Sequence, residues 1–251
     1  MKALQSLAAT LVLAAAAAFS GCATDTSAPL KARPVAPSAF LEHPELMKAN
    51  SQRVPFRTSW QIADLGEIAS HNKGIYVAPV ETKYLRPVKR PLAQVMEGPF
   101  ATSRPVTETT RLLRSDFINA FKTSPQPRLV VANNPGPGVL TLQLALIELN
   151  PTNVVGNAVK YGAPGGSALA PLMKGNIAIE GKVRDGSTGK TLFQFADAEQ
   201  DPFAVVSLRD LSSYGHTRAV MLVWAKEFEE LTRTPASHKV AAPSGIKINP
   251  F

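Results

Sequence analysis

Alternating apolar and polar positions predict the central strands of this chain. Between residues 139 and 149, leucines occupy every second position, which predicts a long strand with one face in the core. The leucines are Leu140, Leu142, Leu144 and Leu146, and the opposite face carries Thr141, Gln143, Ala145 and Ile147. A second alternation predicts a strand with one buried and one solvated face, and it sets Ile177, Ile179, Gly181 and Val183 against Ala178, Glu180, Lys182 and Arg184. The turn sequence at 185–189 (DGSTG) then returns the chain antiparallel as residues 191–196, which predicts a hairpin.

Two segments with apolar residues at helical spacing predict helices. The first begins at Pro105 and ends near Lys122, and its apolar face comprises Leu113, Phe117, Ala120 and Phe121. The second extends from Val220 to Leu231 and ends before Pro235. Two shorter runs, 74–80 (GIYVAPV) and 128–132, predict further strands. Together the elements predict an α+β fold, in which a largely antiparallel sheet of about five strands carries two helices packed on one face.

The amino-terminal segment has the pattern of a secretory signal. Lys2 precedes a thirteen-residue apolar run, Leu7 to Phe19, which is followed by Ser20, Gly21 and Cys22. Because a membrane-spanning helix needs about 20 apolar residues, this run predicts a leader rather than a span. Residues 19–22 (FSGC) resemble the bacterial lipobox, and this resemblance implies cleavage between Gly21 and Cys22 and fatty acylation of Cys22, the only cysteine of the chain.

Acylation of Cys22 implies a membrane as the first partner, since several acyl chains hold a protein firmly at a bilayer. The next residue is Ala23 rather than an aspartate, which in the enterobacterial sorting pattern implies the outer membrane, facing the periplasm. Residues 23–56 contain five prolines among Ser, Thr and Ala, a composition typical of extended chain. We therefore expect a signal peptide (1–21), a lipidated flexible tether (22–56), a single α+β periplasmic domain (57–234) and a C-terminal tail (235–251).

Charge narrows the classes of partner. Removal of the leader, whose only charged side chain is Lys2, leaves 230 residues and lowers the formal net charge from +8 to +7. The periplasm offers this basic domain no nucleic acid, so we expect a periplasmic protein or a cell-envelope polymer as its further partner. A candidate surface for anionic headgroups or glycan consists of basic residues interleaved with Tyr84 and prolines, namely Lys83, Arg86, Lys89 and Arg90. The alternative interpretation of this run is a solvated loop.

Motifs for catalysis are weak in this sequence. Residues 184–191 (RDGSTGKT) end like a phosphate-binding loop, but Arg184 replaces the leading glycine and the segment lies between two predicted strands, so a hairpin turn is favoured. None of the four histidines has a second histidine or cysteine at ligand spacing, and we predict no metal site and no cofactor; they are His43, His71, His216 and His238. We therefore expect a non-enzymatic interaction or scaffolding module. The alternative is a small-ligand carrier or an enzyme that uses the glycine-rich loop 150–174 as a lid.

Several separate segments together resemble one bacterial family. They are the string 175–197 (GNIAIEGKVRDGSTGKTLFQFAD), the strand with Tyr76, Pro79 and Val80, the segment around Trp224 and Ala225, and the lipobox. The most specific pattern is formed by Glu180, Arg184, Asp185, Thr188, Gly189 and Leu192. In these features the chain resembles the proteobacterial lipoproteins catalogued as domain of unknown function 3313. Since that family has no assigned activity, the resemblance implies a fold and a cellular address rather than a chemistry.

Overall fold

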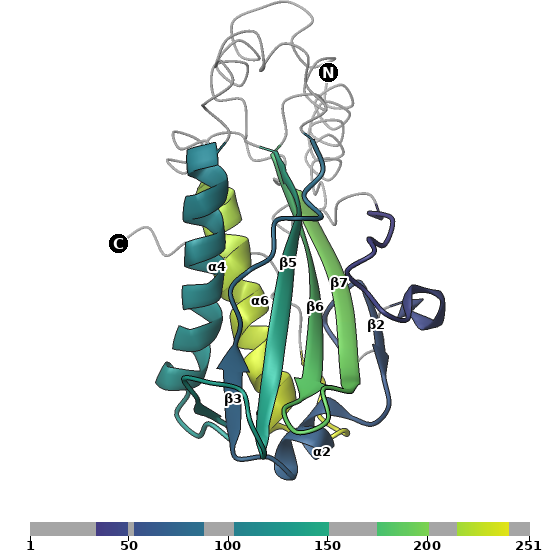
Figure 1. Ribbon diagram of the computed structural model, residues 1–251, viewed down its shortest axis with the longest axis vertical. Helices are drawn as coiled ribbons and strands as arrows, with labels where there is room; N and C mark the ends of the chain where they lie inside the picture. Colours follow the sequence, from purple (N-terminus) through teal and green to yellow (C-terminus); the bar gives the residue numbers. More distant parts are fainter. Residues whose placement is uncertain (1–33, 50–52, 88–102, 151–174, 201–214, 241–251) are drawn as a thin grey trace, which may run out of the picture.

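Two long helices lie across one face of a seven-stranded sheet in the computed structural model of the protein (Figure 1). The structure describes residues 34–49, 53–87, 103–150, 175–200 and 215–240. The strands are β1 (Lys48–Ala49), β2 (Thr58–Gln61), β3 (Gly74–Val77), β4 (Val130–Val131), β5 (Val139–Asn150), β6 (Asn176–Asp185) and β7 (Thr191–Gln200). The helices are α2 (Leu65–Ser70), α4 (Ser103–Thr123) and α6 (Gly215–Arg233), with a short 3-10 helix η2 (Pro44–Leu46). Across the sheet the order is β1-β2-β7-β6-β5-β3-β4.

The sheet is mixed because β3 and β5 are joined through a helix. β3 pairs in parallel with β4 and with β5, whereas the other neighbouring strands pair antiparallel. Parallel neighbours need a crossover connection, and α4 lies within the connection from β3 to β5. The predicted α+β sheet with helices is therefore confirmed, but its details are corrected. Within the described residues there are seven strands rather than about five, three α-helices rather than two, and a mixed rather than a largely antiparallel arrangement.

The leucine stripe of β5 lies in the core between the sheet and the helices, as predicted. All four leucines are fully buried and belong to one cluster with rings from both layers. The Phe228 ring centroid on α6 lies 5.7 Å from that of Phe117 on α4 and 5.8 Å from that of Phe195 on β7. Burial of each such side chain contributes about 1.5–3 kcal/mol, so this aromatic contact stabilises the attachment of both helices to the sheet.

The predicted hairpin of β6 and β7 is also confirmed, and hydrogen bonds within its turn stabilise that turn. The Asp185 carboxylate accepts hydrogen bonds from the N–H groups of Ser187 at 3.0 Å and Thr188 at 2.7 Å, and from the Thr188 hydroxyl at 2.9 Å. Gly189 has φ +70°, a left-handed conformation that glycine adopts without a steric penalty. Because Asp185 already uses two of the turn's N–H groups, this turn is not a phosphate cradle.

The described residues before position 57 are packed against the domain, which corrects the boundary of the predicted tether. Phe40, Leu41, Val54 and Phe56 are all buried. Residues 34–49 and 53–56 therefore belong to the folded part, and only residues 23–33 separate them from Cys22. The predicted tail begins later as well, since Val240 is buried against the core.

Candidate functional site

The face of the sheet away from α4 and α6, which we call the outer face, carries charged side chains beside small ones. On β5, β6 and β7 it includes Ala145, Ile147, Ala178, Glu180, Lys182, Arg184, Thr191, Gln194, Ala196 and Ala198. The alternation in β6 predicts a solvated face, but Glu180 and Lys182 are only 2% and 8% exposed. Residues 34–47, which we call the strap, cover them; the strap is part of the purple segment in Figure 1.

Two apolar residues of the strap lie on a floor of small side chains. Phe40 and Leu41 form a cluster with Ala145, Ile147, Ala178 and Ala198, and this cluster is separate from the main core. The Phe40 ring meets Tyr84 edge-on at 5.7 Å between centroids. The Lys182 ammonium lies 4.4 Å from the Phe40 ring centroid, within the range of a cation–π interaction. The alanines of three adjacent strands leave the space that these two strap side chains occupy.

Three side chains of the sheet hold the carboxylate of Glu42. Lys182 Nζ lies 3.2 Å from Oε1, the Thr191 hydroxyl donates to Oε2 at 2.6 Å, and the Arg184 guanidinium also donates to Oε1. Burial alone would raise the pKa of Glu42, but the hydrogen bonds from Thr191, Lys182 and Arg184 lower it to about 2. The outer face thus contains a carboxylate-binding site, and the chain's own Glu42 occupies it.

Two further side chains of the sheet bind the backbone of the strap. Glu180 accepts hydrogen bonds from the Ser38 N–H at 2.8 Å and the Ser38 hydroxyl at 2.5 Å. The Gln194 side-chain oxygen accepts from the N–H groups of Glu42 at 3.2 Å and His43 at 3.3 Å. Burial raises the pKa of Glu180, although the bonds from Ser38 oppose this shift. The strap is therefore bound across the outer face by side chains of β6 and β7.

The contacts of Glu42 determine how its carboxyl group should titrate. We expect the Glu42 carboxyl group to titrate with a pKa near 2. Since its folded-state pKa is lower than the ordinary value, its contribution to stability is complete above about pH 4.5 and is lost as the pH falls through 2. An NMR titration of side-chain carboxyl carbons measures this pKa, and Lys182→Met should raise it. A Glu42 that titrates at its ordinary value in the unsubstituted protein would contradict the network.

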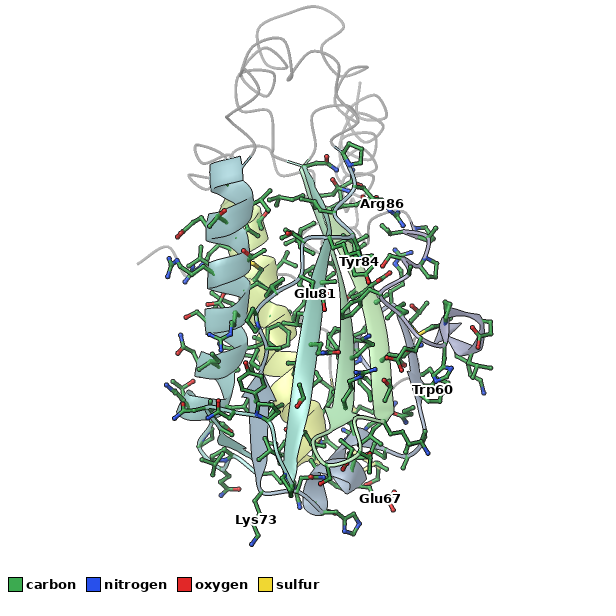
Figure 2. The ribbon with its side chains drawn as sticks, in the orientation of Figure 1. Trp60, Glu67, Lys73, Glu81, Tyr84 and Arg86 are labelled. Atoms are coloured by element: carbon green, nitrogen blue, oxygen red, sulfur yellow. The ribbon has the colours of Figure 1, made fainter. Side chains whose placement is uncertain are left out.

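The basic residues predicted to form an anionic-surface site do not share one environment. Arg86 forms an ion pair with Glu148 at 3.3 Å, and it donates to the carbonyl of Ala36, so it holds the strap. Lys83 is exposed, with its ammonium 5.7 Å from the Tyr84 ring centroid. Figure 2 shows Tyr84 and Arg86 on the segment that follows β3. Lys89 and Arg90 lie outside the described residues, as do Gly21, Cys22 and loop residues 151–174.

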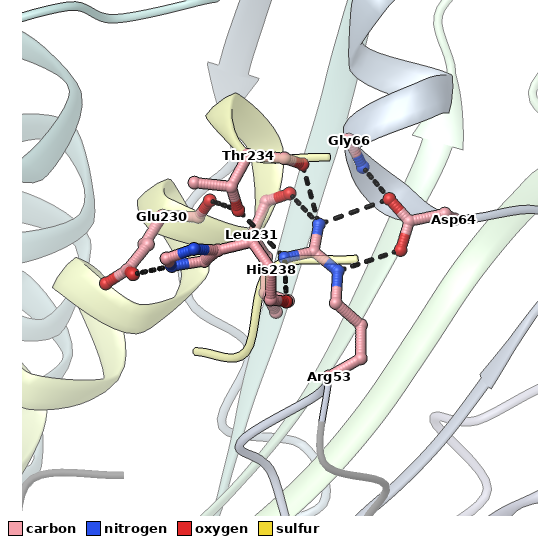
Figure 3. A network of polar contacts seen from close by, with 7 residues as sticks. All are labelled: Arg53, Asp64, Gly66, Glu230, Leu231, Thr234 and His238. Atoms are coloured by element: carbon pink, nitrogen blue, oxygen red, sulfur yellow. Dashed lines mark hydrogen bonds and ion pairs between the residues drawn. The ribbon is translucent and has the colours of Figure 1, made fainter. Parts of the chain in front are cut away.

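A second polar cluster joins the chain before β2 to the end of α6 (Figure 3). Arg53 binds Asp64 through two contacts, Nε to Oδ2 at 2.9 Å and Nη2 to Oδ1 at 3.1 Å. It also donates to the carbonyls of Leu231 at 2.9 Å and Thr234 at 2.8 Å, where α6 ends. Asp64 in turn caps α2 by accepting from the Gly66 N–H. Because these contacts join chain segments to one another, we assign the cluster a structural role.

The described histidines lie apart from one another. The His43 ring lies 4.5 Å from that of Trp60, His71 follows the last residue of α2, and His238 contacts Glu230 at 2.6 Å. The side chain of His216 lies outside the described part of the chain. Among the residues that the structure describes, no group of three or more His, Cys, Asp and Glu side chains could hold a metal ion. None of the described helices combines the length and the apolar character needed to span a membrane.

Two solved structures share a distant similarity of fold with this chain. PelC from Paraburkholderia phytofirmans, solved as a dodecamer, is 11% identical with a TM-score of 0.39, and the match covers 70% of this chain and 96% of that one. The hypothetical protein CT253 from Chlamydia trachomatis is 10% identical with a TM-score of 0.38, and the match covers 64% and 98%, respectively. At these TM-scores we draw no conclusion about function from either. No curated protein matches the chain.

A family profile matches residues 47–228, which include all of the sheet's described strands. The match begins at Met47, the last residue of the strap. The outer face therefore lies within the matched region, whereas most of the strap that covers it precedes the match. The resemblance expected from the hairpin sequence is thereby confirmed. The chain belongs to the family described as "Protein of unknown function (DUF3313)".

Proposed function

We propose that the protein is an envelope lipoprotein whose α+β domain serves as a non-enzymatic interaction module, anchored at the outer membrane and facing the periplasm. The observation that carries the proposal is the junction at Cys22. A basic start, a thirteen-residue apolar run and the residues Ser20 and Gly21 precede the only cysteine of the chain. In this arrangement Cys22 bears the lipid, and residues 1–21 are removed.

The packing of the strap supports an anchor close to the domain. Eleven residues, 23–33, lie between Cys22 and the first described residue, Pro34. Fully extended, that segment spans at most about 40 Å, since each residue adds about 3.5 Å. A lipid on Cys22 therefore restricts the domain to a shallow layer above the membrane surface, where a periplasmic protein or an envelope polymer could reach it.

The polar groups gathered on the outer face favour binding over catalysis. Lys182, Arg184 and Thr191 all engage one carboxylate, and Glu180 and Gln194 engage backbone N–H groups. Such an arrangement holds an extended segment of chain by its backbone and by one acidic side chain. This is the kind of contact that an interaction module makes.

The substitution Cys22→Ala tests the anchor. We expect the variant to keep the folded domain, because the core of the described residues is built without Cys22, and to move from the membrane fraction to the soluble fraction. Mass spectrometry of the native protein should find residues 1–21 absent and acyl chains on Cys22. Lys83→Ala is the control for electrostatic attachment, and it should stay with the membrane. A free Cys22 thiol, an intact leader, or membrane retention of Cys22→Ala would each overturn the proposal.

A further inference from the structure

We propose that the strap is an intramolecular ligand of the outer face that can be released. Its release lengthens the link between the domain and the membrane. The first part stands on the contacts of the strap alone. The second part rests on the proposed lipid on Cys22. In the docked state residues 23–33 form the link, and in the released state residues 23–47 form it, up to the pairing of β1 with β2. The maximal reach then rises from about 40 Å to about 90 Å, because 25 residues replace 11.

The strap is held mainly by polar contacts, which are weaker in water than the apolar contacts of the core. Its two buried apolar residues, Phe40 and Leu41, form a small cluster with side chains of the outer face, whereas β5 contributes a continuous leucine stripe to the main core. Most of the other contacts are hydrogen bonds and ion pairs. The side chains of Glu42 and Arg184 are each 34% exposed, so solvent and salt screen their attraction. We therefore expect the strap to open at a lower free energy than the sheet.

The surface that the strap leaves is one that water can solvate. Release uncovers the charged groups of Glu180 and Lys182 and the amide of Gln194, all of which water hydrates readily. The apolar part of this surface consists mostly of alanines, so little apolar area of the sheet itself becomes exposed. The aromatic core between the sheet and the helices stays covered, because it lies on the other face of the sheet. Opening of the strap thus does not require unfolding of the domain.

Hydrogen exchange on the full chain with Cys22→Ala tests the release without any lipid. The reporters are the amides of Ser38, Glu42 and His43, which bond to side chains of the sheet. We expect them to be protected, yet to exchange at least about tenfold faster than the amides of Leu142 and Leu144 in β5, as expected for a local opening. Raising NaCl from low to high concentration should accelerate the strap amides and leave β5 unchanged.

Two substitutions on the strap separate the Glu42 site from general effects. Glu42→Gln should accelerate exchange of the strap amides by a few-fold, because it removes the charge that Lys182 and Arg184 bind. Glu45→Gln is the matched control and should have no effect, since the Glu45 side chain is 65% exposed and 4.0 Å from its nearest ion partner, His43. Strap amides without protection, strap amides as slow as those of β5, or equal effects of the two substitutions would overturn the inference. If cross-linking captured dimers in which each strap lies on the outer face of the other copy, the claim that the strap binds within its own chain would be overturned.

The change in reach is measured with the lipidated protein in vesicles of phosphatidylethanolamine and phosphatidylglycerol. Acylated Cys22 cannot react with a maleimide, so a dye placed through Ser187→Cys, on the exposed turn of the hairpin, marks a single site. Energy transfer to a membrane dye should change with Glu42→Gln and with salt, and stay constant with Glu45→Gln. No change with Glu42→Gln would overturn the second part. Absence of acylation would overturn the proposed function while the exchange result stands.

Discussion

Replacement of Arg53 by alanine is expected to lower the free energy of unfolding by about 3–5 kcal/mol, as for other ion pairs broken by the loss of one buried partner. The Arg53 and Asp64 side chains are each only 11% exposed, so the substitution leaves a buried carboxylate without its cation. It also removes the donors to the carbonyls of Leu231 and Thr234 at the end of α6. Urea unfolding followed by circular dichroism measures the loss.

Two further variants show whether geometry or charge carries this effect. Arg53→Lys keeps the charge but loses the planar fork that binds both Asp64 oxygens, so we expect it to recover only part of the stability. Arg111→Ala breaks an exposed pair with Glu108 on α4 and should leave the free energy of unfolding nearly unchanged, because solvent screens this pair. If Arg53→Ala cost as little as Arg111→Ala, the cluster would not hold α6 to α2.

Local periodicity explains which elements the sequence could predict. The leucine stripe of β5 and the alternation of β6 report directly on which side chains face the helices, because side chains of a strand alternate between its two faces. The turn from Asp185 to Gly189 is equally local, since its hydrogen bonds stay within that segment. These features needed no knowledge of distant contacts, and the structure confirms them.

The strap could not be predicted from its composition, because its partners on β5, β6 and β7 lie more than 100 residues away in the chain. Proline-rich sequence is typical of free tethers, and nothing near Phe40 shows that it meets Ala145 and Ala178. A signal was nevertheless present on the face predicted to be solvated. Alanines recur there on three adjacent strands, at Ala145, Ala178, Ala196 and Ala198, and such a run of small side chains indicates that something packs closely over them.

Neither helix α2 nor the polar cluster around Arg53 was predicted from the sequence, for two different reasons. α2 has only six residues, too few for an apolar period, but Asp64 followed by Glu67 has the spacing of a helix start with an N-cap and an acidic residue in the first turn. Arg53 has no such local signal, because its partners on α6 lie about 180 residues away. The parallel pairing of β3 is likewise a long-range property, set by the crossover through α4.

Gly181 on β6 and Phe195 on β7 pack directly against each other in the hairpin. The two residues lie directly opposite each other on β6 and β7, and the Phe195 ring covers the glycine. A Cβ atom added at Gly181 would lie 2.1 Å from Phe195 Cε1, far inside van der Waals contact. The ring has no room to move, because it is stacked on Phe56 at 4.0 Å between centroids and is fully buried. Gly181 is therefore required by packing rather than by backbone conformation.

We accordingly expect Gly181→Ala to lower the free energy of unfolding by about 3 kcal/mol, the upper range for overpacking in a well-packed core. Gly136→Ala is the matched control, because a Cβ atom there meets nothing within 4 Å, and it should leave stability within about 0.5 kcal/mol. Phe195→Leu should rescue part of the loss, since it removes the ring atoms that the new methyl group would strike. In a double-mutant cycle, the cost of both substitutions together should fall below the sum of their separate costs by about 1 kcal/mol or more. Strict additivity would mean that the strands separate to admit the methyl group and that the ring does not fix the packing of this hairpin.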